Sequence, residues 1–404
     1  MGVLLAPGAI AADGSDAKTV PGVLSDTFGP GMRIPDSDGN PGASHIGGYI
    51  KVPNLPATKV LYCADPLDLG PDASGGYKPE KLHTSWTSRM TGKQVPTVNV
   101  MRVSYVLYKY GQTTSDAQAA AVDAATYTYL NPGTEYALPN GKRALERLSY
   151  PNVPAEVKTK ANAYMQEAAK FAGPYKVNVT PKTPTSGLKP GSKVEAEVTV
   201  TSASGTKVPN VALDYTWSNT AGAEGETTTG ADGVAKAVLT VKDPGAASIK
   251  ATAKNLPSTA LTAVEPNDSK AQRMLVVGQS AIATGQTGFQ VDALKGGVKV
   301  VKTASDTNKP LAGVEFEVKD KTGKTVASGK TDAKGQWSVV SLAPGEYTVH
   351  EVKAVDGFQL APDQKVTVTD GKTTEAKVVD EKIPEQPKPK PRPVTIPVLP
   401  KTGI

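Results

Sequence analysis

The chain contains few cysteines, histidines and aromatic residues. Cys63 is the one cysteine among 404 residues, so no disulfide can form within the chain. There are three histidines and no acidic residues at EF-hand spacing, so we expect no metal and no cofactor. Aromatic residues make up 5 % of the chain, and the lysines and arginines behind the net charge of +6 are mostly scattered. We therefore expect no nucleic-acid partner.

Long apolar runs are also missing. No stretch of 18 apolar residues occurs, so the sequence predicts no membrane-spanning helix. Residues 1–11 combine a short apolar run, Val3–Ala6, with the small-residue pattern Ala9-Ile10-Ala11. We interpret them as the remnant of a signal peptide, the alternative being an ordinary apolar N-terminus. Residues 12–43 are rich in Gly, Pro, Asp and Ser and predict a flexible leader or an extended first strand.

Glycine and proline are abundant, and their distribution suggests several domains. Residues 44–173 mix short β-like runs with an alanine-rich segment that favours a helix, capped by Ser115 or Asp116. A second helix is expected over Pro154–Ala172, with Gly173 just past its end. These features predict an α+β head domain.

The rest of the chain reads as β-structure followed by a tail. Apolar residues alternate in "KVEAEVTV", and strands recur every 8–12 residues over 174–265, which predicts an Ig-like β-sandwich. Residues 266–290 are a linker or a final strand, and 291–383 form a further all-β domain. Residues 384–404 are proline-rich and predict an extended spacer. The expected fold class is therefore multidomain, an α+β head followed by β-sandwiches and a proline-rich tail.

The end of the chain carries a sorting signal. Leu399, Pro400, Lys401, Thr402 and Gly403 resemble the LPxTG motif of Gram-positive surface proteins and follow the proline-rich spacer. The resemblance implies that a sortase cleaves after the threonine and joins it to peptidoglycan. It also implies a secreted protein held at the cell wall surface. An apolar helix and a basic tail normally follow this motif, so we expect the sequence to be clipped at both ends.

Residues 297–382 resemble the Cna B-type, prealbumin-like domain of Gram-positive adhesins and pilins. The resemblance rests on "KVVKTASDTNKPLAGVEFEVKD", "TDAKGQWSVVSLAPGEYTVHEVKAVDGF" and "AKVVDEK". Members of this family can carry an internal isopeptide bond. By motif, the resemblance implies that Lys302 is the lysine, Asp380 its partner and Glu351 the catalytic glutamate.

The chemistry of such a bond sets conditions that the sequence can meet. A lysine attacks a carboxyl group only when the amine is neutral and the acid is protonated, and burial in apolar surroundings favours both neutral forms. "VKVVKT" and "AKVVDEK" place Lys302 and Asp380 in apolar strands, and Glu351 could transfer the protons. The amide would form once per molecule with loss of water, so we expect no enzyme. The alternative is a Lys–Asp ion pair.

Cys63 has four interpretations. It can be an inert buried residue, pair with another chain, or act as a nucleophile with His45, His83 or His350 as base. The fourth is an internal thioester, because region 44–173 resembles the thioester (TQxA) domains of Gram-positive surface proteins. Tyr62-Cys63 matches the first motif. In "DAQAAAV", Gln118 and Ala120 match the second, with Ala117 where threonine is usual.

The resemblance implies that Cys63 and Gln118 form the thioester and that a nearby amine can open it. We therefore expect a cell-wall-anchored adhesin that attaches to a surface or host ligand with a reactive amine, carried on an isopeptide-stabilised stalk. The alternative is a structural stalk or minor pilin subunit with an inert head. "YKVNVTPK", residues 175–182, faintly resembles the pilin motif that supplies the polymerising lysine.

Overall fold

The chain contains an α+β region followed by β-sandwiches, as expected. The computed structural model describes residues 12–13, 28–40, 42, 44–56 and 58–384. These residues belong to two units, Met1–Val291 and Asp292–Ile404. The expected signal-peptide remnant and the LPxTG motif lie outside the described residues.

The head is built on a six-stranded sheet in the order β2-β3-β4-β13-β12-β5. Cys63 ends β4, near the middle of this sheet, and pairs in register with Met274 of β13. The strands of the head sheet are β2 (Phe28–Ile34), β3 (Ser44–Tyr49), β4 (Leu61–Cys63), β5 (Lys81–His83), β12 (Leu261–Val264) and β13 (Met274–Val276).

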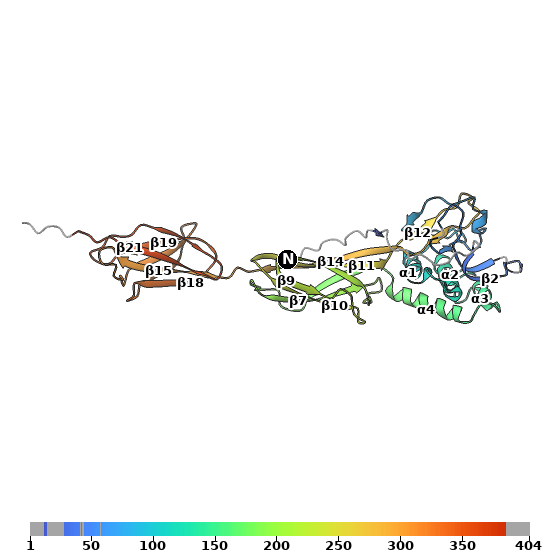
Figure 1. Ribbon diagram of the computed structural model, residues 1–404, viewed down its shortest axis with the longest axis horizontal. Helices are drawn as coiled ribbons and strands as arrows, with labels where there is room; N and C mark the ends of the chain where they lie inside the picture. Colours follow the sequence, from blue (N-terminus) through green and yellow to red (C-terminus); the bar gives the residue numbers. More distant parts are fainter. Residues whose placement is uncertain (1–11, 14–27, 41, 43, 57, 385–404) are drawn as a thin grey trace, which may run out of the picture. The chain divides into compact units, whose positions relative to one another are not determined.

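The described part of the head also contains four α-helices, labelled α1 to α4 in Figure 1, together with a π-helical turn and a 3-10 turn. The predicted alanine-rich helix is confirmed, and the Ser115 side chain accepts a hydrogen bond from the Gln118 N–H at 3.3 Å. The second predicted helix is also present, although it begins at Glu156. These elements are η1 (Pro71–Ala73), α1 (Thr97–Val106), η2 (Leu107–Gly111), α2 (Asp116–Leu130), α3 (Lys142–Ser149) and α4 (Glu156–Phe171).

The head extends beyond the expected range of 44–173. Strand β2 lies in the segment expected to be a flexible leader or an extended first strand, and it pairs with β3. Strands β12 and β13 come from 258–279, which was assigned to the sandwich and a linker, and they pair with β5 and β4. We therefore use "head" for residues 28–173 and 258–279. The boundary differs because strand pairing, which a period-2 pattern does not specify, decides which sheet a strand joins.

The middle sandwich comprises residues 174–257 and 280–291, so the expected final strand is β14. Its two sheets have the orders β6-β7-β10-β9 and β1-β14-β11-β8. Valine and alanine side chains on alternate positions of these strands form one buried core. The strands are β1 (Ala12–Asp13), β6 (Lys176–Pro181), β7 (Lys193–Thr201), β8 (Ala212–Ser218), β9 (Thr220–Gly225), β10 (Val234–Val241), β11 (Gly245–Pro257) and β14 (Ser280–Val291).

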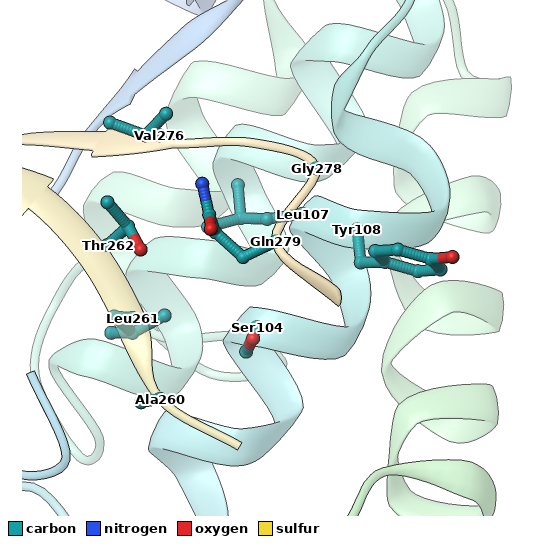
Figure 2. A pocket seen from close by; sticks show the side chains of 9 residues that line it. All are labelled: Ser104, Leu107, Tyr108, Ala260, Leu261, Thr262, Val276, Gly278 and Gln279. Atoms are coloured by element: carbon teal, nitrogen blue, oxygen red, sulfur yellow. The ribbon is translucent and has the colours of Figure 1, made fainter. Parts of the chain in front are cut away.

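A two-stranded antiparallel ribbon connects the sandwich to the head. In the sandwich Pro257 of β11 pairs with Ser280 of β14, and in the head Thr262 of β12 pairs with Val276 of β13. Figure 2 shows the joint, where the ribbon segments meet α1 and the π-helical turn η2. The lining side chains include Ser104 and Leu107, and the space between them is too small for a water molecule. The joint is therefore packed rather than a ligand cavity.

The second unit contains a two-sheet domain, which we call the stalk domain (292–384). Its sheets have the orders β18-β15-β21 and β17-β16-β19-β20, and β15 pairs with β21 in parallel. The strands are β15 (Gly296–Ala304), β16 (Glu315–Asp320), β17 (Thr325–Lys330), β18 (Gln336–Leu342), β19 (Gly345–Lys353), β20 (Gln364–Val368) and β21 (Thr373–Asp380). Among the described residues of the chain, no helix is long and apolar enough to cross a membrane.

Candidate functional site

Lys302, Glu351 and Asp380 meet in the core of the stalk domain. Lys302 lies on β15 and Asp380 ends β21, the adjacent parallel strand, two positions beyond the register partner of Lys302. Side chains two positions apart on a strand point to the same side of the sheet. Lys302 and Asp380 can therefore meet on one face. Glu351 comes from β19, in the other sheet of the domain.

The three side chains are in direct contact and shielded from water. The Lys302 Nζ donates a hydrogen bond to Glu351 Oε2 at 3.0 Å and also contacts Asp380 Oδ1. Lys302 and Asp380 are 0 % exposed, and Glu351 is 3 % exposed. Glu351 Oε2 also accepts a hydrogen bond from the Ala361 N–H at 3.2 Å. The structure thus brings together all three residues implied by the resemblance.

The electrostatics of this site favour proton transfer. Burial raises the pKa of Glu351, and its hydrogen bond to Asp380 raises it further. A carboxyl group with a raised pKa can hold a proton and pass it on. The Phe316 ring lies 5.9 Å from the Lys302 ammonium and forms one apolar wall. This arrangement places the Lys302 amine against the Asp380 carboxyl group, with Glu351 beside them as a group that can carry protons.

Cys63 lies in a second buried site, in the head. Its Sγ is 3.6 Å from Met274 Sδ, and it packs in the same buried cluster as Tyr49. It is 1 % exposed and belongs to a cluster that includes Tyr77 and Tyr127. Burial raises the pKa of the Cys63 thiol, and the negative charge of Asp123 raises it further. The sulfur is therefore held as a protonated thiol.

Gln118 has a different role in the structure. Its Nε2 donates a hydrogen bond to the Tyr110 carbonyl at 2.9 Å, and the Tyr62 hydroxyl donates to the next carbonyl, that of Gly111, also at 2.9 Å. These two side chains satisfy carbonyl groups at the end of η2, where a helix leaves them without backbone partners. Gln118 therefore caps the π-helical turn.

The structure does not bring Cys63 and Gln118 together. In the described part of the head no hydrogen bond joins them, and each has other partners. Cys63 clusters with Tyr127 of α2, which lies nine positions after Gln118. Nine positions correspond to about 180° around a helix, so the two residues occupy opposite sides of α2. The thioester between Cys63 and Gln118 stays a prediction that this geometry does not support.

The polar residue of α2 on the Cys63 side is Asp123, which the sequence analysis missed. Asp123 is 1 % exposed, and its Oδ2 lies 3.0 Å from the Nη2 of Arg147. The same Nη2 donates a hydrogen bond to the His45 carbonyl at 3.0 Å. Burial raises the pKa of Asp123 to about 6. The signal was present in "AAAVDAAT", where a single acid stands in an apolar helix and requires a buried partner.

Comparison with known proteins supports the assignment of the stalk domain. Residues 296–382 match the family model of the SpaA prealbumin-like fold domain. No curated protein sequence matches the chain. The description of the head and the middle sandwich therefore rests on the structure and not on a family match.

Three solved structures have low similarity to this chain. The Bacillus anthracis TIE protein is 19 % identical with a TM-score of 0.46, and the match covers 83 % of this chain and 62 % of that one. This chain thus spans less than two thirds of that protein. The minor pilin GBS52 of Streptococcus agalactiae is 18 % identical with a TM-score of 0.23, covering 54 % of this chain and 99 % of that one. The shaft pilin SpaA of Lactobacillus rhamnosus GG is 12 % identical with a TM-score of 0.22, covering 53 % and 99 %.

Proposed function

We propose that this protein is a cell-wall-anchored surface adhesin of Gram-positive type. Its stalk domain is closed by an amide between Lys302 and Asp380, and its head attaches to a surface or host ligand. The observation that carries the proposal is the buried contact of Lys302 with Glu351 and Asp380. Removing ionisable groups from water costs several kcal/mol for each charged group, so a buried cluster of three calls for a role. A covalent clamp between the first and last strands suits a domain that bears load.

The LPxTG motif supplies the anchor in this proposal. Sortase would cleave between Thr402 and Gly403 and join the chain to peptidoglycan, with the proline-rich tail as the spacer. The protein acts by binding and not by catalytic turnover. Known pilins and surface proteins with similar folds fit this location.

A structural stalk or minor pilin subunit with an inert head is the second candidate function. It is favoured by the position of Gln118, which caps η2 on the side of α2 away from Cys63. The two candidates share the crosslinked stalk and the wall anchor. They differ in whether the head bonds to a ligand.

The stalk amide is tested by intact-mass measurement of the purified protein. The wild-type chain should lack one water molecule for this bond, and Glu351→Ala should retain it because the proton carrier is gone. Peptide mapping should recover Lys302 and Asp380 in one branched peptide. The crosslink would be refuted if the wild type and the Glu351→Ala variant both had the full masses of their own sequences and no branched peptide was found.

The anchor is tested by cell fractionation in a Gram-positive host, with an apolar segment and a basic tail joined after Ile404. The protein should be released only by wall-degrading enzymes. Thr402→Ala should move it to the membrane fraction or the medium, because sortase joins the threonine carbonyl to the wall. Unchanged retention of this variant in the wall would contradict the sorting role.

A further inference from the structure

A backbone N–H group reaches the buried site of the stalk domain from the loop between β19 and β20. This loop covers residues 354–363, and its Ala361 N–H donates a hydrogen bond to Glu351 Oε2 at 3.2 Å. The same oxygen accepts a hydrogen bond from the Lys302 Nζ at 3.0 Å. Glu351 Oε2 is therefore held by two donors, one from a side chain and one from the backbone.

The segment that follows β21 holds this loop in place. The Gln359 N–H donates a hydrogen bond to the Glu381 carbonyl at 2.9 Å, and the Ile383 N–H donates one to the Gly357 carbonyl at 2.8 Å. Ala361 itself packs against the hydrophobic core of the stalk domain. Docking of β21 therefore brings the last residue of this strand and the loop N–H group to the buried site together.

Two carboxyl groups contact the amine in this site, yet only one can form the amide. The Lys302 Nζ contacts both Glu351 Oε2 and Asp380 Oδ1. An amine attacks a carboxyl carbon when that group is protonated, whereas a hydrogen bond donated to a carboxylate stabilises its ionised form. Burial raises the pKa of Glu351, and the Ala361 N–H opposes this increase. By contrast, Asp380 Oδ2 has no hydrogen-bond donor within the described stalk domain.

We propose that Ala361 is a positioning residue whose N–H group selects Asp380, and not Glu351, as the carboxyl group that Lys302 attacks. This inference rests on the stalk crosslink proposed above and deepens it, because it names the group that decides between two possible amides. With its Oε2 held as an acceptor, Glu351 stays the proton carrier. Asp380 is then the group that becomes the amide.

The reaction is balanced within the three side chains. The neutral Lys302 amine attacks the carboxyl carbon of protonated Asp380, and the C–N bond forms. Glu351 Oε2, which faces the amine, takes a proton from the nitrogen. The C–O bond to the Asp380 hydroxyl group breaks, and Glu351 gives the proton to this group, which leaves as water. The products are one amide, one water molecule and Glu351 in its starting state.

The test follows amide formation in the full chain, made by cell-free synthesis and sampled over time by intact-mass measurement. Ala361→Pro removes the N–H group, because proline has none. Loss of water should become about tenfold slower or more, since this is the rate equivalent of a hydrogen bond to a charged group. Peptide mapping should find Lys302 joined in part to Glu351, whereas the wild type should give only the branched peptide of Lys302 and Asp380.

Two further variants separate the N–H group from a general disturbance of the loop. Ala361→Gly keeps the N–H group and should match the wild type in rate and product. Leu360→Pro places a proline one position earlier, at a side chain that is 57 % exposed, and should give only the Asp380 product. A transfer of the crosslink to Glu351 is a change of reaction partner, which looser packing of the loop does not predict.

Asp380→Ala tests the same selection without any change in the loop. This variant leaves Glu351 as the carboxyl group that contacts the Lys302 amine. It should keep the full mass of its sequence, because the Ala361 N–H favours the ionised form of Glu351. Circular dichroism should show a folded protein for this variant and for the loop variants.

Two results would overturn the inference. One is an Ala361→Pro variant that gives the Asp380 product alone, and the other is an Asp380→Ala variant that loses water and joins Lys302 to Glu351. Either result leaves the wild-type crosslink standing, because its water loss and branched peptide are measured separately. A wild-type chain of full sequence mass would instead refute the crosslink itself. The two failures are therefore distinguishable.

Discussion

At the scale of single residues, a buried histidine makes the head sensitive to acid. His45 is 7 % exposed and packs against Phe28 and Tyr49, with ring centroids 4.7 Å and 5.5 Å away. Burial, together with the positive charges of Arg147 and Arg33, lowers the pKa of His45 from 6.5 to about 4. The unfolded chain therefore takes up a proton near pH 6.5, while the folded head does so only near pH 4.

Stability of the head should fall as the pH drops from about 6.5 to 4. A shift of this size corresponds to about 3 kcal/mol of stability, which is fully present above pH 6.5 and is lost progressively as the pH falls to about 4. His45→Phe keeps an aromatic ring and removes the titration, so its free energy of unfolding should vary less with pH. Urea unfolding of both proteins at several pH values between 4 and 7 measures the difference.

His350→Phe is the matched control, since His350 lies in the stalk domain and should leave the pH dependence of the head unchanged. An identical pH profile for the wild type and His45→Phe would show that His45 is not the group responsible. The comparison uses the change of the free energy of unfolding with pH and not its absolute value. A loss of stability that is the same at every pH therefore does not affect the comparison.

Residues that a family motif places on strands were easier to predict than those whose position depends on helix rotation. Lys302 and Asp380 were named from the family motif, and the structure places them in contact. Gln118 matched a motif but turns to the Tyr110 carbonyl. Asp123 was missed because its partner, Arg147, lies on another helix. Which side of α2 meets β4 depends on tertiary packing, and no local pattern encodes it.

At the scale of elements, local signals predicted α2 but not α1. Ser115 and the run of alanines specify α2 through capping and intrinsic propensity. By contrast, α1 and η2 are formed by "TVNVMRVSYV" and "LYKYG", which are rich in β-branched and aromatic residues. Such residues favour strands when considered alone. Burial of Val100, Val103 and Val106 at 0 % exposure shows that packing stabilises α1 against this preference.

The ribbon that joins head and sandwich is the element that sequence analysis could not place. Strand β11 alternates buried and exposed residues like any sandwich strand, whereas all four residues of β12 are buried. The change marks the point at which the chain enters the interior of the head sheet. A short apolar run of this kind does not reveal its pairing partner. Within 266–290 the sequence therefore did not show that β13 pairs with β4 of the head, whereas β14 joins the sandwich.

At the scale of the whole molecule, the head and the middle sandwich depend on each other. Strands β12 and β13 lie between β4 and β5 in the head sheet, yet they are inserted between two strands of the sandwich. Removing them would leave β4 without a neighbour on one side and β5 without any. The buried side chains of Leu261, Val264 and Met274 would be lost as well.

A fragment of residues 28–173 should therefore fail to fold, whereas a fragment of residues 28–291 should fold, because only the longer one completes the sheet. The stalk domain, 292–384, has its own hydrophobic core and should fold alone. Amide dispersion in NMR spectra and cooperative thermal unfolding distinguish the three outcomes. If 28–173 unfolded cooperatively with dispersed amide signals, β12 and β13 would be dispensable. Cys63 would then keep its buried site without Met274, and the ribbon would be a connector and not part of the head.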